Sequence, residues 1–391
     1  MKQRIKSLAS EYASDLIACR HHLHSHPELS FQEYETSKFI QSKLDEYGIP
    51  YTAGVAGTGI VALIKGKNPE KKVIALRADI DALPIEEAND VPYKSQNPGV
   101  MHACGHDVHT TVILGAARIL QQVREEFEGT IKILFQPGEE KHPGGASLMI
   151  KDGALENPKP QAILGLHVLP AMETGQLGFR AGQYMASADE IYMTIKSKGG
   201  HAAAPHLTAD TILIASNLVV SLQQIISRNN NPFSPSVLSI CAFNGGFTTN
   251  VIPSEVKLMG TFRAMDETWR FKAHELIRKQ ATELVHAMGA EIDIDILVGY
   301  PTLYNNETVT ATARTLAEEY LGKEHVEDTE LRMGAEDFAY YSQVIPACFF
   351  RLGTGNKARG ISAGVHTPVF DIDERALEIG AGTMAYLATQ F

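Results

Sequence analysis

The chain has 391 residues, of which 44% are hydrophobic and 21% charged, and its net charge is −11. This length exceeds one typical core, so we expect two domains, or one domain with a large insert. The negative charge and the lack of a Lys/Arg block argue against a nucleic-acid partner, and no apolar run is long enough to cross a membrane. The four cysteines show no framework spacing and the N-terminus has no apolar signal region, so we expect a cytoplasmic location.

The first part of the chain begins with helices and continues with strands and helices in alternation. Apolar residues at helical spacing predict a helix over 3–26, and a second is expected over 33–47. Apolar runs typical of buried strands follow, with further helices between them. These strands are expected at 59–65, 73–79, 129–136 and 162–166, and the helices at 110–124 and 144–152. The order predicts an α/β domain.

The pattern changes near residue 184. The segment from Asp189 to Val298 has the order β-α-β-β-α-β, which is the ferredoxin-like layout. Its strands are expected at 189–197, 236–243, 255–264 and 290–298, and its helices at 208–227 and 267–288. The α/β pattern then returns with helices at 306–321 and 373–389 and a strand at 347–352. We therefore expect a discontinuous domain of residues 1–183 and 299–391, interrupted by a second domain of residues 184–298.

Side chains that bind metals are concentrated in residues 99–109. This stretch holds His102, Cys104, His106, Asp107 and His109. A thiolate and an imidazole two residues apart suit zinc or a similar divalent ion. A polar turn that caps the following helix is the simpler interpretation, but it does not account for three histidines beside the cysteine.

Further candidates lie where predicted strands end, at the edge where open α/β sheets bind ligands. They are Asp79, Asp81, Glu139, Glu140 and His167, with His366 in a later loop. For Asp79 and Asp81, capping of a loop is an equally good explanation. Glu139 and Glu140 are neighbours on an extended chain and point opposite ways, so one can bind metal while the other faces a water molecule.

The combined set is large enough for two divalent ions with an open position for water. Such ions lower the pKa of water and polarise a carbonyl group, and a glutamate accepts the proton, so the set implies hydrolysis. The histidines of segment 20–28 would point in different directions on a helix, and we expect them at the surface or behind the ligands. The GxSxG pattern at 360–364 is not followed by a helix start, which disfavours a serine hydrolase.

Several motifs occur in an order that resembles the M20 family of metallopeptidases and amidohydrolases. They are Arg77-Ala-Asp-Ile-Asp-Ala-Leu-Pro84, His102-Ala-Cys-Gly-His-Asp107, Gln136-Pro-Gly-Glu-Glu140, Gly199-Gly-His-Ala-Ala-Ala-Pro205, Thr249-Asn-Val-Ile-Pro253, Gly334-Ala-Glu-Asp-Phe338 and His366-Thr-Pro368. The likeness covers essentially the whole chain. It is nearest to the branch with hippurate hydrolases, auxin-conjugate amidohydrolases and N-acetyl-diaminopimelate deacetylases. The resemblance implies a catalytic domain with a mixed sheet flanked by helices, and a ferredoxin-like lid and dimerisation domain.

The resemblance also implies roles for individual residues. The metal ligands would be Cys104, His106, Glu140, His167 and His366. Glu139 would be the general base, and His201 would stabilise the oxyanion, often from the partner subunit of a homodimer. Asn250 resembles a residue that helps hold the carboxylate of the substrate, and Arg263 is a second candidate for that role, although an arginine on a strand is more often in a salt bridge.

Asp79-Ile-Asp81 departs from the pattern of better-known members, which carry His-x-Asp at this place. Those members also have a bridging Asp and an acidic ligand where this chain has Cys104, His106 and His167. The branch with thiolate ligation shares the present pattern. It leaves open whether Asp79 binds metal, favours Cys104 as a bridging thiolate, and makes Asp81 a residue that orients a ligand histidine.

We therefore expect a metal-dependent amidohydrolase that cleaves an N-acyl amino acid. The cofactors would be two divalent ions, with zinc as the default and manganese, cobalt or nickel as alternatives. One alternative function is a dipeptidase or aminopeptidase that uses the same site. Another is a protein that binds a metal or an amino-acid conjugate without turnover.

Overall fold

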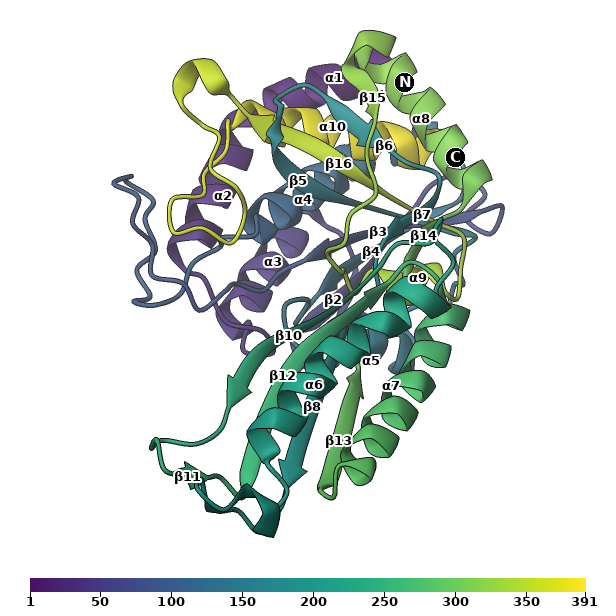
Figure 1. Ribbon diagram of the computed structural model, residues 1–391. Helices are drawn as coiled ribbons and strands as arrows, with labels where there is room; N and C mark the ends of the chain where they lie inside the picture. The colour runs from purple at the N-terminus through teal and green to yellow at the C-terminus, as the bar shows by residue number, and fades with distance from the viewer. The chain divides into compact units, whose positions relative to one another are not determined.

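The computed structural model describes residues 1–391, and the chain divides into two compact units (Figure 1). The first unit is formed by Met1–Gly182, Tyr304–Glu330 and Asp337–Phe391. The second unit is formed by Gln183–Leu303 and Leu331–Glu336. Two short strands, β7 (Gly182–Met185) and β14 (Leu303–Asn305), lie where the chain passes from one unit to the other.

The first unit is built on an eight-stranded mixed sheet. Its strand order is β1-β2-β4-β3-β5-β16-β6-β15. The strands are β1 (Tyr51–Val55), β2 (Gly59–Lys65), β3 (Val73–Asp79), β4 (Thr130–Gln136), β5 (Ala162–Glu173), β6 (Leu177–Phe179), β15 (Val326–Asp328) and β16 (Ala347–Gly355). The central strands β4, β3, β5 and β16 run parallel to one another. Every residue of β3, β4 and β16 is buried, as their mostly apolar sequences predict for strands covered on both faces.

Helices flank this sheet and complete the core of the first unit. They are α1 (Lys2–Glu11), α2 (Ala13–Ser25), α3 (Tyr34–Tyr47), α4 (His106–Gln122), α5 (Gly145–Lys151), α8 (Glu307–Leu321), α9 (Ala339–Ser342) and α10 (Arg375–Gln390). The two most buried of them, α4 and α10, contact each other and β3 in the middle of the sheet. The buried N-terminus of α4 therefore lies near the ends of the central strands, and this is where the site is built.

The second unit contains the expected βαββαβ insert. Its elements follow the order β8 (Asp189–Lys196), α6 (Thr211–Gln224), β10 (Ser236–Asn244), β12 (Glu255–Ala264), α7 (Glu267–Ala287) and β13 (Glu291–Val298). The four strands form an antiparallel sheet in the order β10-β12-β8-β13, so β10 and β13 are edge strands. Apolar residues of α6 and α7 cover one face of the sheet and form a separate core. A two-stranded ribbon of β9 (Gly200–His201) and β11 (Val251–Ile252) extends from it.

The fold class is as predicted, while some boundaries differ. The helix expected over 3–26 is interrupted at Tyr12, where α1 ends and α2 begins. Helix α4 starts at His106 instead of residue 110. Strand β5 continues to Glu173 because its pairing with β16 extends beyond Val168, so His167 lies within the strand. None of the helices has the length and hydropathy needed to cross a membrane.

Candidate metal centre

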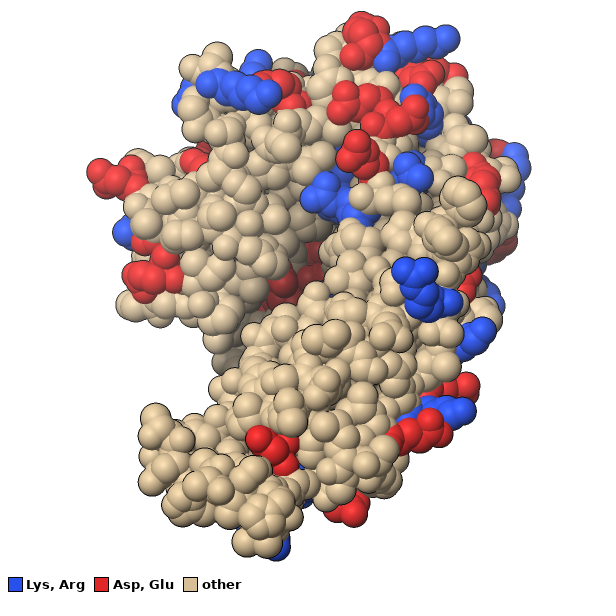
Figure 2. Space-filling model, viewed as in Figure 1, with Lys and Arg blue, Asp and Glu red and all other residues tan.

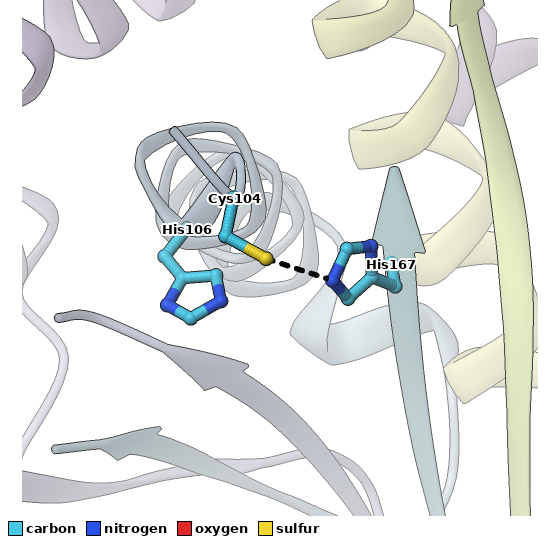
Figure 3. A group of neighbouring side chains, drawn as sticks. All are labelled: Cys104, His106 and His167. Carbon is cyan, nitrogen blue, oxygen red and sulfur yellow. Dashed lines mark hydrogen bonds between the residues drawn. The ribbon is translucent and has the colours of Figure 1, made fainter. Parts of the chain in front are cut away.

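The turn into helix α4 brings Cys104 and His106 together. Gly105 separates them and has a φ of 85°, a conformation that residues with a Cβ rarely adopt. A Cβ at this position would lie 2.6 Å from Cγ2 of Val168. Glycine at position 105 therefore allows the turn to approach β5, and Figure 3 shows that Cys104 then faces His167 of that strand.

His167 offers one ring nitrogen to this site. Its Nδ1 lies 2.8 Å from the carbonyl oxygen of Val168, so Nδ1 carries the proton and donates to it. The unprotonated Nε2 lies 3.4 Å from Sγ of Cys104 (Figure 3). Burial is the main cause that holds the pKa of His167 well below its usual value, with Arg351 as the next cause. A neutral imidazole with a free Nε2 is the form that binds a metal ion.

Glu140 and His366 complete the opposite side of the site. His366 Nε2 lies 3.3 Å from Sγ of Cys104 and 3.1 Å from Oε1 of Glu140. The backbone N–H of His366 donates to the carbonyl of Ala103 at 2.7 Å, which ties its loop to the segment before Cys104. His366 has a φ of 61°, which is uncommon for a residue with a side chain and is concentrated at functional sites.

The donor atoms form two groups of three that share one sulfur. Cys104, His106 and His167 are one group, and Cys104, Glu140 and His366 are the other. Within each group all ligand atoms lie within 4.8 Å of one another. Nε2 of His106 is buried without a hydrogen-bond partner, although buried polar atoms are normally paired. One thiol, three imidazoles and a carboxylate are a donor set that suits zinc-like divalent ions, so the residues present fit a dinuclear site.

Asp81 fixes His106 from behind. Its Oδ1 lies 3.1 Å from Nδ1 of His106, while its Oδ2 accepts hydrogen bonds from Oγ of Ser30 at 2.6 Å and from the backbone N–H of Glu140 at 3.0 Å. We expected Asp81 to orient a ligand histidine, and a carboxylate with such contacts fixes the tautomer of the imidazole.

Negative charges predominate around His106 and Cys104 and raise the pKa of both side chains. Burial alone would lower the pKa of His106, but Asp79, Asp81 and Glu140 outweigh it and raise the pKa to about 10. Burial, followed by the charge of Glu140, raises the pKa of Cys104 well above its usual value. A site that holds excess protons in this way must release them when a dication binds, because metals bind the thiolate and the neutral imidazole.

Glu139 lies beside these groups. It forms a third cluster of ligand-type atoms with His106 and Glu140, and it is 6% exposed. Glycine is needed at position 138, just before Glu139, because its φ is 59° and a Cβ there would lie 2.3 Å from the ring of Phe31. Oε1 of Glu139 accepts a hydrogen bond from the backbone N–H of Asp337 at 3.3 Å.

Several candidates prove to be partners of other charged groups. Asp79 accepts from Arg77 and lies 2.6 Å from Nδ1 of His109, whose Nε2 accepts from the backbone of Val168. These bonds use both oxygens of Asp79, and its pKa is held low, against the effect of burial, chiefly by Arg77 and His106. Asp79 therefore serves to hold side chains in place.

A buried ion-pair network lies beside His106, and it accounts for one of the N-terminal histidines. Asp107 accepts from Nε of Arg20 at 2.9 Å and lies 2.8 Å from Nδ1 of His24. His24 Nε2 in turn lies 3.2 Å from Glu87. His102 is fully buried near this network, and burial lowers its pKa to about 4. Sequence reasoning missed Arg20 and Arg77, although a cation within a buried segment requires an anionic partner.

The remaining candidates belong to the second unit. His201 is exposed on the β9–β11 ribbon, where its register partner is Val251. Asn250 lies beside it, because the N–H of Ala202 donates to the carbonyl of Asn250 at 3.0 Å. Arg263 is on β12, where its Nε donates to Oγ1 of Thr261 at 3.2 Å without an ion pair. The structure therefore joins His201 and Asn250 on one ribbon and places Arg263 on the adjoining sheet.

Residues 75–390 match the model of Peptidase family M20/M25/M40. The chain belongs to this family, and it is a hydrolase whose site fits metal-dependent amide hydrolysis.

Its relatives include enzymes that are named for small amide substrates. The chain is 40% identical to IAA-amino acid hydrolase ILR1-like 5 of Arabidopsis thaliana, over 96% of this chain and 86% of that protein. It is 41% identical to the N-acetyl-L-cysteine deacetylase of Bacillus subtilis, over 94% and 86%. A similar solved structure is that of Bacillus subtilis YXEP, which is described as a dinuclear metal binding peptidase from the M20 family. It matches with a TM-score of 0.84 and 35% identity, over 97% of this chain and 98% of that chain.

Proposed function

We propose that this protein hydrolyses the amide bond of an N-acyl amino acid and releases a carboxylate and an amino acid. The observation that carries the proposal is the position of Glu139 beside two donor groups that share Cys104. A binding protein would need the donor groups but would have no use for a second carboxylate next to Glu140. The relatives named for acyl amino acids support this substrate class.

The donor groups would hold two divalent ions, with Cys104 as the shared ligand. Cys104, His106 and His167 would hold one ion, and Cys104, Glu140 and His366 the other. When bound, the ions supply Lewis acidity that polarises the amide carbonyl and lowers the pKa of water. Zinc is the default for a Cys/His/Glu set, and manganese, cobalt and nickel suit mixed sites as well.

Glu139 would accept the proton of the attacking water and pass it to the nitrogen that leaves. The hydrogen bond from the N–H of Asp337 to Oε1 helps to fix the position of the Glu139 carboxylate. His201 would donate a hydrogen bond to the oxyanion from Nε2, because its Nδ1 accepts from the backbone N–H of Ala203 at 3.0 Å and its ring is exposed. Asn250 and Arg263 would bind the carboxylate of the amino acid, and the lack of an ion pair at Arg263 supports that role.

The test is a comparison of substrates with the metal-loaded protein. N-acetyl and N-benzoyl amino acids and the matching dipeptides are incubated with wild-type protein and with Glu139→Gln, and the products are identified by mass spectrometry. We expect release of free amino acid from the acyl substrates by the wild type alone. Faster cleavage of the dipeptides would favour a peptidase, and the absence of any cleavage would favour a binding protein.

We further propose a homodimer formed through the second unit. Helix α6 contains no charged residue, and its Leu213 and Val220 are 54% and 70% exposed. Figure 2 shows a largely uncharged surface on the visible part of the second unit, whereas acidic and basic residues are interspersed over the first. The neighbouring edge strand β10 carries the exposed Val237 and Phe243. Such an apolar surface beside an unpaired strand favours association.

The four cysteines support a cytoplasmic location for this protein. All four are free thiols, as expected in a reducing compartment.

A further inference from the structure

A residue of the Gly334–Phe338 motif contacts the proposed base. The backbone N–H of Asp337 donates to Oε1 of Glu139 across 198 positions of sequence. The direction of this N–H depends on how the backbone of Asp337 is held. Both residues are buried, with Asp337 fully excluded from solvent.

The side chain of Asp337 holds that backbone in place. Its Oδ1 accepts hydrogen bonds from Nη2 of Arg77 at 2.7 Å and from Nε2 of Gln136 at 2.8 Å. Its Oδ2 accepts from Nε2 of Gln136 at 2.8 Å and from the backbone N–H of Ala146 at 2.9 Å. One carboxylate therefore connects β3, β4 and the start of α5 at the end of the strand from which Glu139 emerges.

Every one of these partners of the Asp337 carboxylate is a donor. An asparagine at position 337 would therefore place its NH₂ group against Arg77 or against the N–H of Ala146, whichever way the amide is turned. The change preserves the volume of the side chain but forces two donors together. Arg77 is also fully buried and pairs with Asp337 as well as with Asp79, so the change removes one of the negative charges that offset this buried cation.

We propose that Asp337 is a positioning residue for Glu139: its carboxylate, held by Arg77, Gln136 and Ala146, aims its own N–H at the base. This inference rests on the proposed function, because it takes Glu139 to be the base. A base must lie within hydrogen-bond reach of the proton that it removes, so a displacement of about 1 Å can reduce the rate by about 10²-fold.

The test combines crystallography and kinetics on the metal-loaded protein. In Asp337→Asn we expect kcat to fall between about 10-fold and 10²-fold while KM and metal content change little. In the crystal structure of this variant, the Glu139 carboxylate should leave its wild-type position. Arg77→Lys keeps the positive charge but loses the planar guanidinium with its several N–H donors, so it should show the same changes to a smaller extent. If Asp337→Asn does not fold, Arg77→Lys tests the inference instead.

Asp373→Asn is the matched control, because Asp373 is an equally buried carboxylate that accepts its hydrogen bonds from Asn356 and Arg375. It should leave kcat and the position of Glu139 unchanged. A wild-type kcat, or an unmoved Glu139, in Asp337→Asn would overturn the inference. If the wild type cleaves no amide, the proposed function fails. The crystal structure of Asp337→Asn then still shows whether Asp337 positions Glu139.

Discussion

Asp81 holds His106 by its Nδ1 at 3.1 Å and leaves the buried Nε2 of the same ring facing Glu140, which lies 4.0 Å away. The carboxylate thereby fixes both the tautomer and the orientation of this ligand. Asp81→Asn should weaken metal affinity by about 10-fold to 10²-fold, because an amide holds the imidazole less firmly. Competitive titration with a chelating dye measures the effect. Equal affinities of the variant and the wild type would show that Asp81 does not support the ligand.

Glu139→Gln should separate catalysis from metal binding. Removal of a general base reduces turnover by about 10²-fold or more, while the donor groups around Cys104 remain intact. Steady-state kinetics and elemental analysis of the same sample measure both quantities. A fully active variant would rule out the role of Glu139 as the base.

Cys104→Ala should lose both metal ions, because its sulfur belongs to both donor groups. Mass spectrometry of the metal content measures the ions bound per chain. Cys241→Ala is the control, since Cys241 is an exposed free thiol on β10 of the second unit. Unchanged stoichiometry in Cys104→Ala would remove the residue from the ligand set.

Asp373 should make the stability of the protein depend on pH at acidic values. Hydrogen bonds from Arg375, against a smaller effect of burial, lower the pKa of this carboxyl to about 2. In the unfolded chain the pKa of this carboxyl is near 4. The ionised carboxylate therefore stabilises the folded protein at pH values above about 4, and this contribution is lost as the pH falls toward 2. Asp373→Asn should therefore cost about 1 kcal/mol at pH 7 and much less near pH 2. Urea unfolding of both proteins across this range measures the difference, and a constant difference would contradict the assignment.

Val220→Glu should disrupt the proposed dimer, because it places a charge on the uncharged helix α6, at a site that is 70% exposed in the single chain. Sedimentation velocity measures the mass in solution. Val344→Glu is the control, as Val344 is a 52% exposed valine of the first unit. A monomeric wild type, or a dimeric Val220→Glu variant, would exclude this interface.

Much of the fold could be predicted because its strongest signals are local. The buried strands β3 and β4 are mostly apolar, and the βαββαβ order of the second unit follows from periodicity. The break at Tyr12 was missed because the apolar stripe passes through it without a Pro or Gly. Short edge strands such as β6 and β15, of three residues each, are too brief to give a pattern.

The ligand candidates could be named from sequence, and the resemblance favoured Cys104 as the bridging ligand, but the contacts among these residues could not be derived from spacing. The shared position of Cys104 depends on His167 and His366, which meet it from 63 and 262 positions away. The place of Asp337 beside Glu139 is likewise set by tertiary packing. The sequence did show the motif that contains Asp337, yet gave no sign that its carboxylate would pair with Arg77.

The order in which the first unit can be completed during synthesis follows from the path of the chain. Strand β16 lies between β5 and β6 in the sheet, and His366 follows it, so both leave the ribosome well after β5 and β6. The contiguous segment Gln183–Leu303, which contains the second core, emerges earlier and can fold first. The nascent chain therefore carries an open sheet edge at β5 until residues 347–355 arrive, and a chain truncated before His366 would lack one of the two donor groups.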